Sequence, residues 1–326
     1  MSSTRILFFG FRDLVHPCFD EFVEAVNGRY PVSLHDPALP TADQFGDVRI
    51  VVDQGGWGSH AMVDAAVAEG VKLWQVIGTG LDHLDVGYIL KSGIPLANTP
   101  GVFSGIALAE HALFFMLSFA KNFRLSTSNI KSGVFYHPTN DELEGKTLGL
   151  VGLGASGREL AKRGAALGMR ILAVDTVDIP QSIREECHIE FLGKPEELGK
   201  ILTEADYISL HTPLTSKTRH LINETTLKLM KPTAVVINVA RGELIDERAL
   251  IDALRSGRIR GAGLDTFAHE PIDLTHPLLQ MENVIATPHI AGGTTGTVRR
   301  RAKAAAQNVF RVLDGLSPLY QVTSVE

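Results

Sequence analysis

The chain has 326 residues, a length that suggests about two domains, and its 44% apolar and 21% charged residues are typical of a globular protein with a substantial core. The net charge of −6 gives no electrostatic basis for binding nucleic acid or an anionic membrane, and no apolar stretch is long enough to span a bilayer. Cys18 and Cys187 stand in no metal-binding or redox spacing. We expect them to be small buried hydrophobes in a cytoplasmic protein.

Short apolar runs alternate with helical patterns over the first 98 residues, which calls for a parallel sheet covered by helices. Helices are expected at Ser59–Glu69 and at Asp85–Lys91, the second capped by Asp85 and stopped by Gly93. The expected strands are Ile6–Phe9, Val32–Leu34, Ile50–Val52, Leu73–Val76 and Leu96–Ala97.

Asn98-Thr99-Pro100-Gly101 ends this alternation, and a long helix is expected from about Ser104 to about Ser128. Its centre is apolar on nearly all sides, so it should be buried on most faces. In a two-domain chain this suggests a subunit interface, where His111 would be a hydrogen-bonded interface residue rather than a ligand.

A glycine-rich motif, Gly152 to Gly157, follows the apolar run Leu148 to Val151 and opens a helical pattern. In dinucleotide-binding motifs the first glycine allows a tight turn, the second lets the backbone approach a pyrophosphate, and the third lets the helix pack on the strand. The helix N-terminus favours the phosphates. Asp175 ends the next apolar run, where an acid binds the adenosine ribose. This succession of strand, glycine-rich loop, helix, strand and aspartate favours dinucleotide binding over a merely structural glycine turn.

A second α/β unit therefore begins at Leu148, and a last helix is expected from about Thr295 to Leu313. The fold class is α/β, with two doubly wound parallel-sheet domains and a cleft between them as the natural site. The expected strands of this unit are 148–151, 171–174, 189–191, 207–210, 235–238, 261–264 and 284–286.

Arg241, Glu270 and His289 each come just after one of these expected strands. Open α/β sheets bind ligands beyond the carboxyl ends of their strands, so the three side chains could share a site. An arginine binds a carboxylate or polarises a carbonyl, a histidine moves a proton, and a carboxylate orients and charges the histidine. The trio suits a 2-oxo acid. Each residue also has a plainer explanation, as a surface ion pair, a loop corner, or one of 12 histidines.

The chain resembles the D-isomer-specific 2-hydroxyacid dehydrogenases, which use NAD, over almost its whole length. The motifs that carry the resemblance occur in the family's order: Val76 to Asp85, Asn98 to Gly101, Ala109 to His111, Gly152 to Gly157 with Asp175, His211 to Thr215, Asn238 to Gly242, Asp265 to Pro271, and Pro288 to Gly292.

The resemblance implies a Rossmann NAD-binding domain (99–290) inserted into a flavodoxin-like substrate-binding domain (1–98), to which a C-terminal helix (291–326) returns. It implies that Arg241 binds the substrate carboxylate and carbonyl, that His289 is the general acid/base, and that Glu270 is its partner. Backbone N–H groups around Gly78, Thr79 and Gly80 would hold the carboxylate. The residues that it places on the cofactor are Gly152, Gly154, Ala155, Ser156, Gly157, Asp175, Thr212, Pro213, Val239, Ala240, Arg241, Asp265, His289 and Gly292.

These roles predict hydride transfer between NAD(H) and C2 of a small D-2-hydroxy acid or 2-oxo acid. His289 would give a proton in reduction and take one in oxidation, and Glu270 would favour the imidazolium. Domain closure would exclude water. Asp175 is followed by Thr176 rather than a basic residue, so NADP is less favoured than NAD. A homodimer through the NAD-binding domain is also expected.

Two further features admit two explanations each. Trp57, in the loop Gln54 to Gly58, either forms part of the substrate wall or packs on its neighbours at the surface. Asp82, His83 and Asp85 could form a metal cluster, but Asp85 as a helix cap is favoured, and no metal site is predicted.

The segment Asp53 to Trp57 has an acid and no nearby arginine, so a phosphorylated substrate is poorly matched. We expect glyoxylate, hydroxypyruvate or a longer 2-oxo acid. The alternatives are a phosphoglycerate dehydrogenase, a non-catalytic corepressor-like NAD(H)-sensing protein on the same fold, and an amino-acid dehydrogenase, which would need a lysine base near the cleft.

Overall fold

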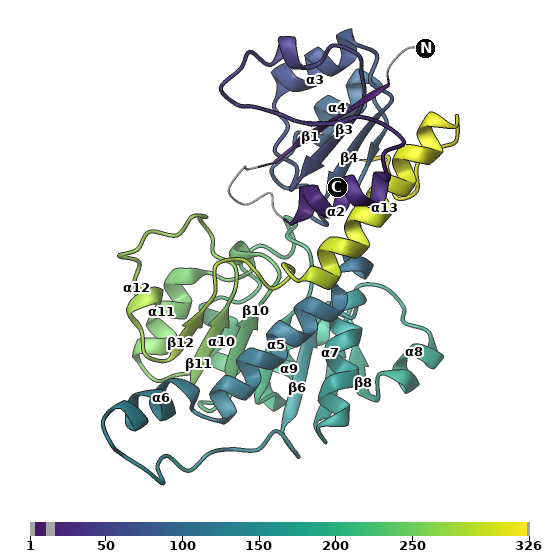
Figure 1. The fold of residues 1–326 in the computed structure, drawn as a ribbon. Helices are drawn as coiled ribbons and strands as arrows, with labels where there is room; N and C mark the ends of the chain where they lie inside the picture. The colour runs from purple at the N-terminus through teal and green to yellow at the C-terminus, as the bar shows by residue number, and fades with distance from the viewer. Residues whose placement is uncertain (1–3, 11–16, 325–326) are drawn as a thin grey trace. The chain divides into compact units, whose positions relative to one another are not determined.

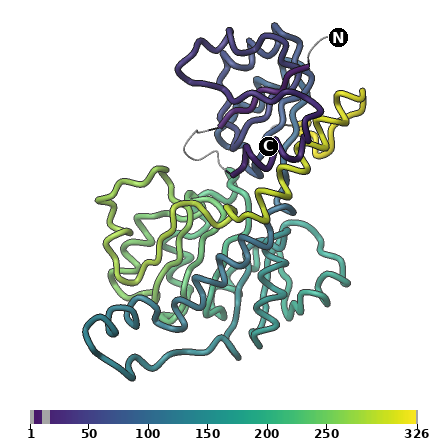
Figure 2. Tube along the Cα trace, in the orientation of Figure 1, coloured from purple at the N-terminus to yellow at the C-terminus, as the bar shows by residue number. Residues whose placement is uncertain are grey.

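The computed structural model describes residues 4–10 and 17–324, which form two units. Unit 1 contains Met1–Phe103 and Gly293–Glu326, and unit 2 contains Ser104–Gly292. The chain leaves unit 1 once and returns to it once, as the colour gradient along the trace in Figure 2 shows. Each unit contains a mainly parallel sheet with helices on both faces, which confirms the predicted fold class.

Unit 1 has a six-stranded sheet in the order β13-β5-β4-β3-β1-β2, in which only the β13–β5 pair is antiparallel. Helices α2 and α13 pack on one face, and α3 and α4 pack on the other (Figure 1). The strands are β1 (Arg5–Phe9), β2 (Val32–Leu34), β3 (Val48–Gln54), β4 (Leu73–Ile77), β5 (Leu96–Ala97) and β13 (Gln321–Val322). The helices are α2 (Cys18–Val26), α3 (His60–Ala68), α4 (Val86–Ser92) and α13 (Thr295–Leu313), with short 3-10 turns η1 (Ala42–Gln44) and η2 (Gly101–Phe103).

The ends of α4 follow directly from the sequence. The Asp85 carboxylate accepts the Tyr88 N–H at 2.9 Å, and Gly93 ends the helix with φ 82°. Both features confirm the expected cap and stop. The short strand β13 was missed, because two residues are too few to show an alternating pattern.

Unit 2 has a seven-stranded parallel sheet in the order β12-β11-β10-β9-β6-β7-β8. Chain order reverses direction between β6 and β9, which makes this pair the switch point where such sheets bind ligands. Helices α5 and α7 cover one face, and α9 to α12 cover the other. The strands are β6 (Thr147–Val151), β7 (Arg170–Val174), β8 (Ile189–Gly193), β9 (Tyr207–Leu210), β10 (Val235–Asn238), β11 (Gly261–Leu264) and β12 (Val284–Ala286). The helices are α5 (Gly105–Ala120), α6 (Phe123–Lys131), α7 (Ala155–Ala166), α8 (Gln181–Glu186), α9 (Leu198–Glu204), α10 (Glu224–Leu229), α11 (Glu247–Arg255) and α12 (Pro277–Gln280), with 3-10 turns η3 (Pro195–Glu197) and η4 (Gly242–Leu244).

The prediction of a single long helix over 104–128 is wrong in one respect, because this segment forms two helices, α5 and α6. Asn122 adopts the left-handed conformation (φ 45°), which ends α5 and starts α6 in a new direction. Its side chain donates to Asn140 Oδ1 at 3.1 Å, and the Arg260 guanidinium donates to its amide oxygen at 3.2 Å. An asparagine tolerates this conformation better than most residues, so these contacts stabilise the break.

Burial of α5 is confirmed on most of its surface. A Cβ on Gly263 of β11 would lie 2.6 Å from the Phe115 ring, so the glycine lets α5 pack directly on the sheet. Both cysteines are free and buried, as expected. Among the described residues, every helix is too short or too polar to cross a membrane.

Candidate functional site

The glycine-rich loop between β6 and α7 has the geometry of a dinucleotide cradle. Gly152 has φ 97°, and a Cβ there would lie 2.5 Å from the carbonyl oxygen of His211. A Cβ on Gly157 would lie 2.2 Å from the carbonyl oxygen of Gly152, so the third glycine lets α7 pack against the loop. Nothing lies within 4 Å of the Cβ position of Gly154, which caps α7 without a side-chain acceptor. Open space beside free helix N–H groups fits a pyrophosphate.

Asp175 follows β7 and binds this loop directly. Its Oδ2 accepts the Leu153 N–H at 2.6 Å, and its Oδ1 accepts the Val177 N–H at 3.0 Å. The carboxylate therefore lies at the edge of the cradle, where an acid meets an adenosine ribose in such folds.

Lys194 is a basic residue near Asp175 that the sequence analysis missed. It follows β8, and its Nζ lies 3.2 Å from the carbonyl oxygen of Thr176 and 2.6 Å from Asp178 Oδ1. The ammonium group lowers the pKa of Asp178. Neighbouring parallel strands bring the two loops together, although Lys194 is far from Thr176 in the sequence.

A buried imidazole connects the cradle to the end of β9. His211 Nδ1 lies 2.9 Å from Ser156 Oγ, and its Nε2 lies 2.9 Å from Ser209 Oγ. Burial lowers the pKa of His211 to about 4, so the ring is neutral near pH 7. Thr212 and Pro213 follow it, and the Thr212 backbone N lies 3.1 Å from the Cβ position of Gly152.

The structure brings Glu270 and His289 together at the carboxyl end of the unit 2 sheet. Glu270 Oε2 lies 2.7 Å from His289 Nδ1, and Glu270 Oε1 accepts the Phe267 N–H at 2.9 Å. Burial acts to raise the pKa of Glu270, but these hydrogen bonds and the charges of His289 and Arg241 outweigh it and lower the pKa. The side chain of His289 is 46% exposed, so its ring remains accessible.

Asn238 and Gly242 shape the turn after β10 that carries Arg241 and let it lie against the loop that carries Glu270. Asn238 accepts the Ala240 N–H at 3.0 Å and donates to the Arg241 carbonyl at 2.8 Å, which shapes the turn after β10. A Cβ on Gly242 would lie 1.9 Å from the Phe267 carbonyl carbon. Only glycine therefore lets this turn lie against the loop that carries Glu270.

Asp265 is fully buried and holds the loop that carries His289. Its carboxylate accepts the N–H groups of Ile290 (2.9 Å) and Ala291 (2.7 Å) and the Thr287 hydroxyl (2.6 Å). The Thr287 hydroxyl also lies 2.9 Å from His111 Nε2, so His111 is hydrogen-bonded within its own chain. Val239, Ala240 and Gly292, also predicted to contact the cofactor, lie in the same strand-end loops or beside them.

In unit 1, Gly78, Thr79 and Gly80 follow β4. Gly78 donates its N–H to Thr99 Oγ1 at 2.9 Å, and Asn98 Nδ2 donates to the Thr79 carbonyl at 2.9 Å. Within the described part of the chain, the N–H groups of Thr79 and Gly80 donate no hydrogen bond. Neighbouring free N–H groups can together bind an anion.

A buried carboxylate shapes the other unit 1 loop, Gln54 to Gly58. Asp53 is fully buried, and it accepts the N–H groups of Gly56, Trp57 and Gly58 and the indole N–H of Trp74, at 2.9–3.1 Å. The Trp57 ring stacks on His83 at 4.2 Å and is 52% exposed. The Trp57 ring therefore packs on a neighbour and also presents part of its surface to solvent.

In the Asp82–Asp85 segment, Asp85 is the helix cap that the sequence favours. His83 stacks on Trp57, and Asp85 caps α4 and lies 3.0 Å from His60 Nε2. Over residues 4–10 and 17–324, no group of three potential metal ligands comes together.

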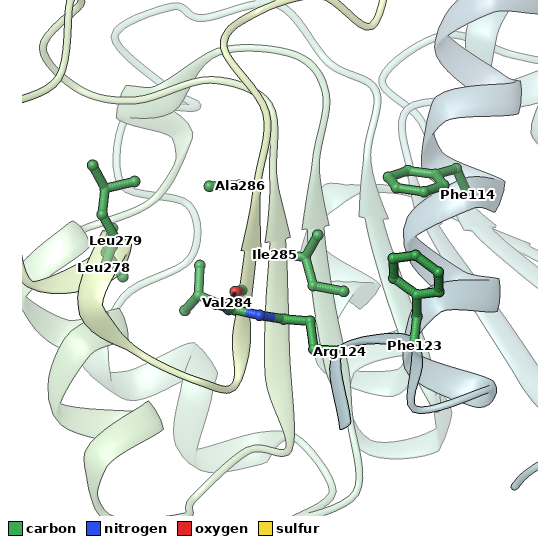
Figure 3. A pocket seen from close by; sticks show the side chains of 8 residues that line it. All are labelled: Phe114, Phe123, Arg124, Leu278, Leu279, Val284, Ile285 and Ala286. Carbon is green, nitrogen blue, oxygen red and sulfur yellow. Dashed lines mark hydrogen bonds between the residues drawn. The ribbon is translucent and has the colours of Figure 1, made fainter. Parts of the chain in front are cut away.

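A surface hollow of about 340 Å³ lies away from these residues, beside the edge strand β12 (Figure 3). Phe114 and Phe123 enter it from α5 and α6, opposite Val284 and Ile285 on the strand. Arg124 donates to the carbonyls of Met281 (3.1 Å) and Val284. The hollow contains none of the predicted site residues and is mostly apolar.

Comparison with known proteins agrees with this geometry. The family model of the D-isomer specific 2-hydroxyacid dehydrogenase, NAD binding domain, matches residues 113–291. A D-3-phosphoglycerate dehydrogenase from Methanocaldococcus jannaschii is 39% identical over 303 residues, which are 86% of this chain and 56% of that protein. The chain thus spans little more than half of that relative.

This chain covers most of the length of two other similar proteins. A glyoxylate reductase from Thermofilum pendens is 39% identical over 268 residues, 78% of this chain and 77% of that protein. The structure of a D-2-hydroxyisocaproate dehydrogenase has a TM-score of 0.87 at 26% identity, covering 98% of this chain and 100% of that one. The chain belongs to the D-isomer specific 2-hydroxyacid dehydrogenase family.

Proposed function

We propose that this protein is an NAD-dependent reductase of small 2-oxo acids that also oxidises the matching D-2-hydroxy acids. The observation that carries the proposal is the 2.7 Å contact between His289 and Glu270, with Arg241 close enough to affect the pKa of Glu270. An acid/base, its carboxylate partner and a cation for a carboxylate are the groups that this reaction needs.

In reduction, His289 donates a proton to the carbonyl oxygen of the substrate through the ring nitrogen that does not face Glu270. Glu270 fixes the ring through Nδ1 and stabilises the positive charge that the ring carries before the transfer. Arg241 binds the substrate carboxylate and polarises the carbonyl. In oxidation, His289 takes the proton from the hydroxyl. NAD(H), when bound, supplies the hydride acceptor or donor.

The dinucleotide is proposed to lie on the loop from Gly152 to Gly157, with its pyrophosphate over Gly154 and the helix N-terminus. Ala155 and Ser156 lie on the pyrophosphate, Thr212 and Pro213 lie along the cofactor, and Asp175 binds the adenosine ribose. Val239, Ala240, Asp265 and Gly292 flank the nicotinamide end. The proposed cofactor is NAD rather than NADP because Asp175 would meet the adenosine ribose, although Lys194 lies beside Thr176. The ratio of the KM values for NADH and NADPH, in the wild type and in Lys194→Ala, tests this choice.

The proposed substrate-binding domain comprises residues 1–98 and the C-terminal segment 291–326, and the proposed NAD-binding domain comprises 99–290. These bounds differ by a few residues from those of units 1 and 2. The free N–H groups of Thr79 and Gly80, next to Gly78, would hold the carboxylate, and Trp57 would line the side-chain end. The proposed substrate is glyoxylate, hydroxypyruvate or a longer 2-oxo acid.

A homodimer in the cytoplasm completes the proposal. Six apolar side chains of α5 and α6 are 38–56% exposed in the single chain, and a second copy of the chain would cover several of them. They are Ile106, Phe114, Leu117, Phe123, Leu125 and Ile130. The free cysteines suit a reducing compartment.

The test is NADH oxidation followed at 340 nm with a panel of 2-oxo acids that includes glyoxylate, hydroxypyruvate, longer apolar acids and 3-phosphohydroxypyruvate. Turnover of one acid that His289→Ala and Arg241→Ala both abolish would support the proposal and name the substrate. Turnover of the phosphorylated acid alone would make the protein a phosphoglycerate dehydrogenase. Tight NADH binding without turnover of any acid would point to a nucleotide sensor.

A further inference from the structure

An arginine side chain contacts the loop that is proposed to hold the substrate carboxylate. Arg301 lies on α13, 222 residues after Thr79, and its Nη2 donates to Thr79 Oγ1 at 2.8 Å. Thr79 Oγ1 in turn donates to the Thr99 carbonyl at 3.3 Å. All of these residues belong to unit 1.

Spacing along the chain could not reveal this contact, because Arg301 and Thr79 are 222 residues apart. Three consecutive arginines begin the second turn of α13, and each has a different partner. Arg299 pairs with Glu21 at 3.0 Å, and Arg300 donates to the Phe103 carbonyl at 3.0 Å. Arg301 is the member of this run that donates to the Gly78–Gly80 loop.

We propose that Arg301 is a substrate-affinity residue that fixes Thr79 and adds a full positive charge beside the free N–H groups of Thr79 and Gly80. The inference rests on the proposed function, and it extends the carboxylate site beyond the backbone groups to a side chain. Two backbone N–H groups supply only partial charges, whereas a guanidinium supplies a formal one, so the loop would favour an anionic substrate over a neutral analogue.

The thiol of Cys18 lies near Arg301. Cys18 is close enough for the charge of Arg301 to act on it, but burial raises the pKa of Cys18 to about 12. The thiol is therefore uncharged at neutral pH. Arg301 is one of several residues that hold the Gly78–Gly80 loop. Thr99 accepts the Gly78 N–H, and Asn98 donates to the Thr79 carbonyl. Removing the guanidinium should therefore change binding more than folding.

The experiment compares Arg301→Met, Arg301→Lys and Arg299→Met with the wild type, using the 2-oxo acid that the wild type reduces best. We expect Arg301→Met to raise the KM for the acid roughly tenfold or more, the loss expected for one charge-assisted contact, with kcat and the KM for NADH nearly unchanged. Arg301→Lys should restore most of the affinity. Arg299→Met, the matched control on the same helix, should behave as the wild type.

A second substrate separates charge from structure. The methyl ester of the same 2-oxo acid is neutral, so the preference for acid over ester should fall in Arg301→Met and remain in Arg299→Met. An unchanged KM for the acid, or equal losses for acid and ester, would overturn the inference. Thermal unfolding of each variant identifies a folding defect, and Arg301→Lys keeps the test valid if Arg301→Met is unstable.

The inference can also be tested if the protein proves not to be a 2-oxo acid reductase. If the wild type reduces none of the acids, the same variants are compared for binding of oxamate, a carboxylate analogue of a 2-oxo acid, to the protein–NADH complex. Weaker oxamate binding in Arg301→Met alone would support the inference without the reductase activity. Equal oxamate binding in wild type and Arg301→Met would contradict it.

Discussion

His289 occupies a left-handed backbone conformation, φ 54°, that residues with a side chain rarely adopt. The three hydrogen bonds that Asp265 accepts from the same loop, together with the bond from the His289 N–H to the Asp265 carbonyl at 2.8 Å, hold it there. Such a conformation costs about 1–3 kcal/mol and persists where its surroundings fix it, which is common at functional sites. The backbone is thus fixed before any ligand binds.

Replacing Glu270 by glutamine should lower kcat for 2-oxo acid reduction about a hundredfold, because the neutral amide no longer stabilises a charged imidazole. The pKa of Glu270 lies below the usual value for a glutamate. The wild-type carboxylate therefore stays ionised at a pH where an ordinary glutamate would already be protonated. The acid limb of kcat should therefore not begin near pH 4.5. Glu282→Gln, an exposed site outside the cluster, is the control, and equal kcat values in the two variants would contradict the role of Glu270.

His211 should make stability depend on pH. Burial lowers its pKa from 6.5 to about 4, so between these values the unfolded chain binds a proton that the folded chain does not. Stability is therefore fully present above pH 6.5 and decreases by up to about 3 kcal/mol as the pH falls to 4. Urea unfolding across this range should show a smaller decrease in His211→Gln than in the wild type. The exposed His137→Gln should follow the wild-type curve, and parallel curves for all three would show that another group is responsible.

The sequence alone could predict that Arg241, Glu270 and His289 lie near one another, because each follows a strand and parallel strands end at one edge of the sheet. Lys194 and Arg301 could not be predicted in this way. Each meets its partner through a tertiary contact, between neighbouring strands for Lys194 and across 222 residues for Arg301. A spacing rule along the chain does not detect such contacts.

At the scale of elements, the glycine-rich loop allows a matched comparison. Gly157→Ala would place a methyl group 2.2 Å from a backbone oxygen, so we expect a loss of about 2 kcal/mol or more in stability together with weaker NADH binding. Gly154→Ala meets no atom within 4 Å and should fold as the wild type, yet it should weaken NADH binding by filling the space proposed for the pyrophosphate. Thermal unfolding and titration of NADH fluorescence measure both effects. Unchanged NADH affinity in Gly154→Ala would place the cofactor elsewhere.

Asp53 should control the order of the Trp57 loop. Asparagine in its place would turn an NH2 group toward two of the four N–H donors, which leaves buried donors without an acceptor at a cost of about 1–3 kcal/mol. The chain has only two tryptophans, so in a Trp74→Phe background the fluorescence of Trp57 reports the loop alone. We expect Asp53→Asn to shift that emission to longer wavelength as the ring leaves His83. Identical spectra with and without the substitution would show that the loop keeps its shape without the carboxylate.

Most strands were predictable because they are fully buried apolar runs bounded by glycine, proline or aspartate. The break between α5 and α6 was not, because it depends on one left-handed asparagine inside a continuous helical pattern and on contacts with Asn140 and Arg260. The role of Asp53 was missed for a related reason. An acid at the end of a strand shows its acceptor role only when the glycine turn after it is known.

At the scale of the whole molecule, the proposed homodimer predicts a mass of about twice 35.3 kDa by light scattering. Leu117→Glu combined with Phe123→Glu should shift the protein to monomers, because two charges would enter an apolar interface. Leu39→Glu, at an exposed apolar site in unit 1, should leave the mass unchanged. A wild-type monomer, or a dimer that survives the double substitution, would remove this face from the interface.

The discontinuity of unit 1 has a consequence for the order in which the protein matures. Unit 2 is one continuous segment that ends at Gly292, whereas the core of unit 1 needs α13 and its sheet needs β13. A ribosome therefore delivers all of unit 2 before it delivers the pieces that cover Ile6, Phe8 and Val52. Until then α2 is the helix available to cover this sheet face, and chaperones that bind nascent chains should stay bound to the rest of the face until α13 emerges.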